Sequence, residues 1–233
     1  KNEKILLTVF QKVIGTTKIG ITDNFFELGG DSIQSIQICS LARNMGLLIT
    51  PRTIFEHQTI AELASHANTE NVVRVGPVET RGEVAITPIQ SWFFENHHTH
   101  LHHWNQSIVF YKEKCGDIET IRNIVAKLVQ HHSGLMTLFK KHSLTYVGNI
   151  DSQNVTWSVT YKELDNLEES VRQREIDRLE EQAQTTLNIL DGPIMKLVII
   201  KEKTNLYRFF WVIHHLLIDT VSWHILLEDF HTL

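Results

Sequence analysis

The sequence lacks the features that are typical of several classes of protein. Its 233 residues include only two cysteines, Cys39 and Cys115, without CxxC spacing, which argues against a disulfide scaffold and favours a reducing compartment. The net charge is -5 and no basic block occurs, so nucleic acid and anionic membranes are not expected as partners. The most apolar stretches, 197–200 and 209–213, are far too short to span a membrane, and the apolar run 5–7 is too short for a signal peptide. We therefore expect a soluble, cytoplasmic protein.

The composition that remains is that of a folded protein with more than one domain. Hydrophobic residues at 42% and charged residues at 21% are ordinary globular values. A length of 233 residues corresponds to roughly one and a half domains. Residues 69–85 show no sustained helical or strand period and contain Gly76-Pro77 and Gly82, which predicts a linker. We expect one domain over 1–68 and a second over 86–233.

The first part is predicted to be all helical. Apolar residues recur at helical spacing over 5–14 and over 33–45, from Ile33 to Met45, and a glycine follows each stretch. Thr59 and Glu62 fit a capping box that opens a last helix. About four helices in fewer than 70 residues can form a small bundle, near the lower size limit for independent folding.

The second part is predicted to be mixed α/β. Thr87-Pro88-Ile89-Gln90 supplies an N-cap, a proline at the first helical position and a capping Gln, so a helix should carry Trp92, Phe93 and Phe94. Stretches rich in β-branched and aromatic residues predict strands at 106–111, 154–161, 194–201 and 206–214. Helices are expected at 118–131, at about 164–187 with a charged solvated face, and from about residue 220.

The first motif places two glycines before a serine at a predicted helix start, in the order Gly29, Gly30, Asp31, Ser32. Glycine permits positive φ and close approach of another molecule to the backbone. A helix N-terminus presents free N–H groups and partial positive charge, so it tolerates an attached phosphate. The four residues alone also fit a plain turn followed by an N-cap.

The flanking residues extend this pattern. Residues 25–32, Phe-Phe-x-Leu-Gly-Gly-Asp-Ser, resemble the attachment sequence of peptidyl carrier proteins of nonribosomal peptide synthetases, and the resemblance covers about 1–67. It implies that Ser32, in an attachment site that includes Gly30 and Asp31, carries 4′-phosphopantetheine. The thiol of that arm would hold an aminoacyl or peptidyl thioester. Implied partners are a phosphopantetheinyl transferase, an upstream adenylation domain and a downstream condensation domain. Asp31, followed by Ile33, resembles the carrier subtype that precedes an epimerization domain.

The second motif is His214-His215-x-x-x-Asp219 after an apolar strand. A histidine at a strand end can project into a cleft, and an ordinary pKa near 6.5 suits proton transfer at neutral pH. A buried histidine paired with backbone also fits. A metal site has no clear further ligand in the motif, and we expect no metal here. The histidine-rich stretch 97–103 is irregularly spaced and is expected to be a surface loop.

The longer run 214–223, which continues with Thr220 and then Val-Ser-Trp, resembles the signature of epimerization domains. These are relatives of condensation domains and of chloramphenicol acetyltransferase, and condensation domains usually have Gly where this chain has Thr220. The segments 87–93 and 103–107 resemble the opening motifs of epimerization domains. The resemblance implies a chloramphenicol-acetyltransferase-like α/β lobe after the four-helix carrier. It assigns proton transfer to His215, shaping of the loop to His214 and Asp219, and lining of a tunnel for the arm to Ser222 and Trp223.

Inversion of the Cα centre of a thioester from L to D requires a base and donors for the developing negative charge. Two departures from the family pattern stand out. The later glutamate motif of the family is not found, so the chain is expected to hold only the N-terminal lobe and to be truncated. Met136 replaces an arginine that is expected to pair with Asp219, and a buried Asp219 would then lack its counter-charge. We therefore expect that Met136→Arg does not lower thermal stability.

Two other functions fit the same sequence. A condensation domain would form a peptide bond, although Thr220 and Asp31 argue against it. A non-catalytic carrier and docking module would only shuttle the thioester, which the missing glutamate favours.

Overall fold

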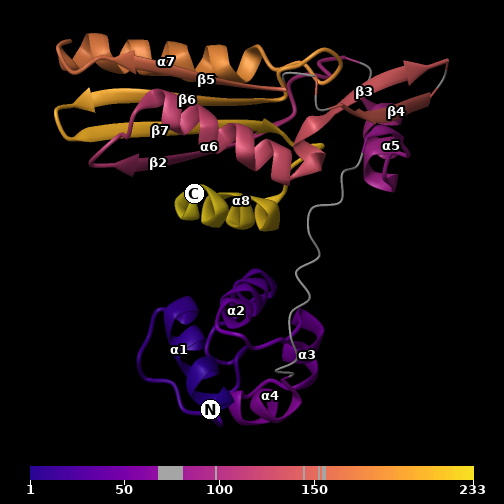
Figure 1. Cartoon of the computed structure of the whole chain (residues 1–233), viewed down its shortest axis with the longest axis vertical. Helices are drawn as coiled ribbons and strands as arrows, with labels where there is room; N and C mark the ends of the chain where they lie inside the picture. Colours follow the sequence, from indigo (N-terminus) through magenta and orange to yellow (C-terminus); the bar gives the residue numbers. More distant parts are fainter. Residues whose placement is uncertain (68–80, 98, 144, 152, 154–155) are drawn as a thin grey trace. The chain divides into compact units, whose positions relative to one another are not determined.

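The computed structural model describes residues 1–67, 81–97, 99–143, 145–151, 153 and 156–233. The chain divides into two compact units, Lys1–Gly76 and Pro77–Leu233, whose elements are labelled in Figure 1. Within the ranges that the structure describes, every helix is too short or too polar to span a membrane.

The first unit consists of helices joined by loops, with bounds α1 Asn2–Ile14, α2 Ser32–Asn44, α3 Pro51–Glu56 and α4 Ile60–His66. Gly15 ends α1 in the left-handed conformation, at φ 77, as its position predicts. Thr59 caps α4 by accepting from the backbone N–H of Glu62, whose carboxylate accepts from the Thr59 hydroxyl. The buried core draws on every helix and on the loops between them, and includes Leu6, Phe10, Phe25, Ile38, Leu47, Ile54 and Leu63.

Helix α2 buries a face that the apolar spacing alone did not indicate. Its buried residues are Ser35, Ile38 and Ala42, at a spacing of three and four that keeps them on one side of the helix. Ile33 and Met45 lie off this face and are 36% and 47% exposed. Both ends of the helix therefore carry apolar side chains on the surface.

The second unit contains a four-stranded sheet in the order β2-β7-β6-β5, with bounds β2 Asn105–Lys112, β5 Trp157–Glu163, β6 Met195–Lys203 and β7 Leu206–His214. The β5 and β6 strands are parallel and the other two pairs are antiparallel. Strand β7 has the predicted bounds. The predicted strand 154–161 corresponds to β5, but positions 154 and 155 lie outside the described residues.

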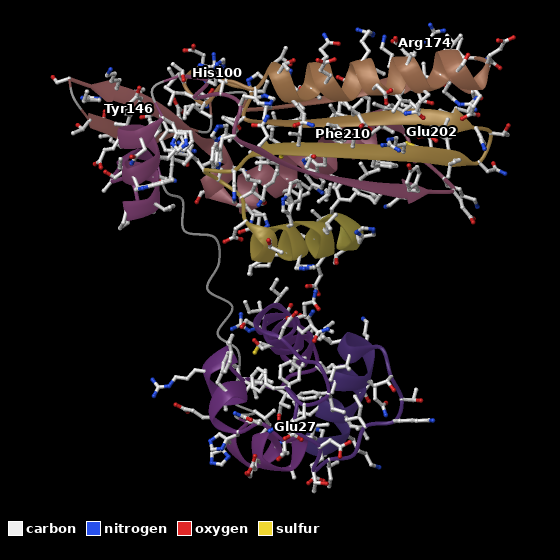
Figure 2. All side chains as sticks on the ribbon, turned by 180° about the vertical axis from the view of Figure 1, so that it is seen from behind. Glu27, His100, Tyr146, Arg174, Glu202 and Phe210 are labelled. Atoms are coloured by element: carbon white, nitrogen blue, oxygen red, sulfur yellow. The ribbon has the colours of Figure 1, made fainter. Side chains whose placement is uncertain are left out.

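Helices cover both faces of this sheet (Figure 1). The bounds are α6 Ile118–His131, α7 Glu169–Thr185 and α8 Thr220–Thr232. Helix α7 packs on one face through a cluster that includes Ile176, Leu179 and Phe210, and α6 and α8 lie on the other face. Phe210 and Arg174, an exposed residue of α7, are labelled in Figure 2. The helix predicted over 164–187 begins only at Glu169, because Leu164 packs in the core and Leu167 donates to its carbonyl in a turn.

A second sheet was not predicted. Its three strands are β1 Gly82–Val84, β3 Thr137–His142 and β4 Thr145–Ile150, in the order β1-β4-β3. The expected linker 69–85 lies outside the described residues as far as position 80, and its last part is not a linker, because Gly82–Val84 pairs with β4.

Helix α5 (Pro88–Asn96) packs against this small sheet. It begins with the predicted capping box, in which Thr87 and Gln90 satisfy each other's backbone N–H. Phe93 and Phe94 are buried, whereas Trp92 is largely exposed. The ring of Phe94 stacks on Tyr146 of β4 at 3.9 Å between centroids, and Tyr146 is labelled beside α5 in Figure 2.

Candidate functional site

The start of α2 holds the first predicted site. Gly29 has φ 90, which favours glycine, and a Cβ on Gly30 would come within 2.4 Å of the buried Phe25 ring. Asp31 is the extended N-cap residue, and its carboxylate accepts from the backbone N–H of Gln34 at 2.7 Å. The turn therefore presents Ser32 as the first residue of a 13-residue helix.

The Ser32 side chain is exposed, and its hydroxyl has no hydrogen-bond partner among the described residues. Gly29, where a Cβ would meet nothing within 4 Å, leaves room for another molecule to approach the backbone. The N–H groups of the first helical turn favour a phosphate bonded at this position. The residues present thus fit a covalently attached phosphopantetheine arm on Ser32.

His214, the last residue of β7, is fully buried and both of its ring nitrogens have partners. Nε2 donates to the carbonyl of Leu101 at 2.8 Å, and Nδ1 accepts from the backbone N–H of Leu216 at 3.3 Å. Burial lowers the pKa of His214 from 6.5 to about 4, so the ring is neutral at neutral pH. The geometry fits the predicted role of holding the loop and leaves no ring atom free for substrate.

His215 differs from its neighbour because its side chain is exposed. Its backbone N–H donates to the carbonyl of Trp104 at 2.7 Å, which ties the loop to the residues before β2. Its Nδ1 lies 2.7 Å from the carbonyl oxygen of Ile218, and its Nε2 lies 3.2 Å from Nε2 of Gln106. His215 is thus the motif histidine that a substrate can reach.

Gln106 of β2 was not predicted as a site residue. It lies within the motif 103–107, but no local signal marks its partner, which is 109 residues away in the chain. Its Oε1 accepts from the indole N–H of Trp223 at 3.1 Å. The structure therefore brings together His215, which follows β7, Gln106 of β2 and Trp223 of α8.

Asp219 lies at the N-terminus of α8 and is exposed rather than buried. The backbone N–H and then the hydroxyl of Ser222, each 2.7 Å from Oδ1, lower the pKa of the carboxyl. The concern that Asp219 lacks a counter-charge therefore does not apply, because hydrogen bonds stabilise the carboxylate. Met136, where the arginine was expected, packs partly buried against the main core.

The two residues predicted to line a tunnel, Ser222 and Trp223, differ in their burial and contacts. Ser222 is half-buried and bonded to Asp219, whereas Trp223 is buried with its ring 5.8 Å from that of Trp211. A tunnel-lining role for both stays a prediction.

One group of potential metal ligands occurs among the described residues, namely His131, His132 and Asp229, whose ligand atoms lie within 4.8 Å of one another. Nε2 of His132 is 2.7 Å from the Asp229 carboxylate, so these two side chains already satisfy each other by a hydrogen bond between the residue after α6 and α8. In the stretch 97–103, position 98 lies outside the described residues, and His102 Nδ1 accepts from the backbone of Ile189.

The two cysteines are free and partly buried. Burial raises the pKa of Cys39, which lies on α2 seven positions after Ser32, to about 11, and burial also raises the pKa of Cys115. Burial outweighs the opposing charges of Arg43 near Cys39 and of Lys112 near Cys115, so neither thiol is activated as a nucleophile.

Comparison with known proteins agrees with the division into two units. The family described as "Phosphopantetheine attachment site" matches residues 4–67, and the family described as "Condensation domain" matches residues 80–233. Surfactin synthase subunit 2 of Bacillus subtilis (strain 168) is 35% identical over 98% of this chain, and Gramicidin S synthase 1 of Brevibacillus brevis is 34% identical over 99%. The chain spans only 6% and 21% of those two relatives.

Among solved structures, the epimerization domain from the third module of tyrocidine synthetase B is 31% identical, with a TM-score of 0.61 over 67% of this chain and 35% of that one. The starter condensation domain of rhizomide synthetase is 12% identical, with a TM-score of 0.56 over 64% of this chain and 37% of that one. The second similarity shows the fold alone.

Proposed function

The chain belongs to the condensation-domain family of nonribosomal peptide synthetases, with a phosphopantetheine carrier domain before it, and we propose that it serves the inversion of an aminoacyl or peptidyl thioester from L to D. The observation that carries this proposal is the placement of His215, exposed directly after β7 with its Nδ1 bonded to the Ile218 carbonyl and its Nε2 on the other side of the ring. The similarity to the epimerization domain of tyrocidine synthetase B supports it.

The carrier domain is of the kind that bears 4′-phosphopantetheine, and we assign the attachment to Ser32. When bound, the arm supplies a thiol that holds the substrate as a thioester, which makes the Cα proton acidic. The Asp31 cap fixes the helix start, and the Gly30 turn sets the Ser32 hydroxyl in solvent. We further propose that the first unit is a four-helix carrier bundle and the second a chloramphenicol-acetyltransferase-like lobe.

The residues of the second unit would then move the proton. His215 Nε2 accepts the proton from Cα, and the carbonyl of Ile218, 2.7 Å from Nδ1, stabilises the resulting positive charge on the ring. His214 is neutral and buried, so it orients the loop and adds no charge beside His215. Hydrogen bonds between Asp219 and Ser222 fix the first turn of α8, and this turn fixes the end of the loop that contains His215.

The proposal extends to partners. A phosphopantetheinyl transferase would load Ser32, an upstream adenylation domain would supply the amino acid, and a downstream condensation domain would accept the product. The carrier and condensation families that the two units match support this proposal.

The test is exchange of the Cα proton. The chain is loaded with an aminoacyl-phosphopantetheine in D2O, and deuterium incorporation is followed by mass spectrometry after release. We expect exchange by the wild type, at least about 10²-fold slower exchange by His215→Ala, and no change in His142→Ala, an exposed histidine at the end of β3. Equal exchange in His215→Ala and wild type would leave only the carrier function.

Peptide-bond formation is the second candidate, because the family that matches residues 80–233 is described as condensation. Supplying a second loaded carrier separates the two functions: a new amide with retained L configuration supports condensation, whereas D product without an amide supports inversion.

A further inference from the structure

We infer that Gln106 is a positioning residue that fixes which nitrogen of His215 is free to take a proton, and that it covers this nitrogen until substrate displaces it. The inference rests on the proposed function for the role of His215. It concerns three side chains that lie in contact: His215, Gln106 and Trp223.

The hydrogen-bond chain has one consistent assignment of protons. The indole N–H of Trp223 can only donate, so the Gln106 atom 3.1 Å from it is the amide oxygen. The amide nitrogen of Gln106 therefore faces His215 Nε2, 3.2 Å away, and donates to it. His215 Nε2 thus presents its lone pair to Gln106.

The other end of the ring requires the same tautomer. The carbonyl oxygen of Ile218 can only accept, so His215 Nδ1, 2.7 Å away, carries the proton. Two partners, one on each side of the imidazole, therefore select the tautomer with a proton on Nδ1 and with an unprotonated Nε2 that accepts from Gln106. Trp223 is buried with its ring against Trp211, so the residue that orients Gln106 is itself held in the core.

This arrangement has a consequence for proton transfer. A protonated His215 would place Nε2–H against the amide N–H of Gln106, and turning the amide would place its nitrogen against the Trp223 N–H. Both states lose a hydrogen bond. Protonation of His215 therefore requires Gln106 to move aside, so the substrate must replace the amide at Nε2 before the proton moves.

The test reads the protons directly, without any activity. The chain is labelled with 15N-histidine, the His215 signals are assigned by their loss in His215→Gln, and long-range 1H–15N correlations are recorded at pH 7.5. In wild type we expect a protonated Nδ1 and an unprotonated Nε2. In Gln106→Glu the carboxylate accepts from both neighbours, so both His215 nitrogens should carry protons.

Two further variants make the test specific. Trp223→Phe removes the donor that orients the amide, and we expect a fraction of His215 with Nε2 protonated. Gln130→Glu, the same change at an exposed glutamine of α6, should leave the His215 signals as in wild type. A protonated Nε2 in wild type, or unchanged His215 signals in Gln106→Glu, would overturn the inference.

The activity experiment separates this inference from the proposed function. If the loaded wild type exchanges its Cα proton, Gln106→Glu should slow exchange about 10²-fold at pH 7.5, because the base is already protonated. If the wild type shows no exchange, the proposed function fails, and the histidine spectra still decide the role of Gln106.

Discussion

Helices α2 and α8 lie in different units and begin in the same way. In each, an aspartate in extended conformation, Asp31 at φ -128 or Asp219 at φ -134, accepts from the backbone N–H three residues later at 2.7 Å. The nearby serines differ: Ser222 donates its hydroxyl to Asp219, whereas Ser32 has no such partner among the described residues. The position of the serine relative to the cap therefore decides whether its hydroxyl is available for chemistry.

The sharpest way to test this comparison is to remove each hydroxyl. Ser32→Ala should abolish the mass increase that a phosphopantetheinyl transferase and coenzyme A produce on the chain, because the attachment oxygen is gone. Ser222→Ala should be loaded like wild type, since that hydroxyl is already bonded to Asp219. Intact-protein mass spectrometry measures both, and loading of Ser32→Ala at another residue would break the comparison.

The loops that lead into the two caps should also differ in their response to acid, because only the second contains the buried His214. Its pKa falls from 6.5 to about 4 on folding, so the unfolded chain binds the proton first as the pH drops. The neutral, buried His214 therefore adds to the free energy of unfolding above pH 6.5. This contribution, about 3 kcal/mol in total, is lost as the pH falls from 6.5 to about 4.

Urea unfolding at pH 7.5 and pH 5, followed by tryptophan fluorescence, measures this loss in the second unit, which contains all 5 tryptophans. In His214→Gln the free energy of unfolding should differ less between pH 7.5 and pH 5 than in wild type. In His142→Ala this difference should be the same as in wild type. An unchanged difference in His214→Gln would place the acid sensitivity elsewhere.

The turn before the first cap should be intolerant of a side chain. A Cβ on Gly30 would lie 2.4 Å from the ring of Phe25, which is 0% exposed and cannot move into solvent. Gly30→Ala should cost about 1–3 kcal/mol in the free energy of unfolding. Gly116→Ala in the second unit meets nothing within 4 Å and should change it by less than about 0.5 kcal/mol. Urea unfolding followed by circular dichroism compares the two.

The smallest effect is expected from the caps themselves. Asp31→Ala and Asp219→Ala should each cost about 0.5–2 kcal/mol, with the larger loss at Asp219 because its carboxylate accepts from both the backbone and the hydroxyl of Ser222. Thermal unfolding of the two variants shows which of them loses more stability. A larger loss in Asp31→Ala would show that the bond from Ser222 Oγ adds nothing.

The sequence predicts those parts of the fold whose signals are local. Helix α6 and strand β7 have their predicted bounds, because an amphipathic period and an apolar run each extend over the whole element. Strand β3 was missed because its second half, Lys140 to His142, is polar and exposed, and β4 because it begins with the exposed Thr145 and has Gly148 in its middle. Their pairing with β1 joins segments far apart in the chain, which no local pattern shows.

The residues of the candidate site also differ in whether a local sequence signal marks them. Ser32 and His215 were predicted because each lies in a contiguous motif with a chemical reason for its residue types. Gln106 was missed because its partners, His215 just after β7 and Trp223 in α8, are brought to it only by folding. Asp219 was expected to lack a counter-charge if buried, because Met136 stands where an arginine was expected, but Asp219 is exposed and Ser222, three residues on, donates hydrogen bonds to it.

The burial of Cys39 bears on how long an activated acyl group can survive on the arm. A thioester is open to attack by any nearby thiolate, and such an attack would transfer the acyl group to the wrong sulfur. With a pKa of about 11, Cys39 is ionised in about one molecule in ten thousand at pH 7. If the arm is attached at Ser32 as proposed, burial of Cys39 on the same helix removes one competing nucleophile for the thioester.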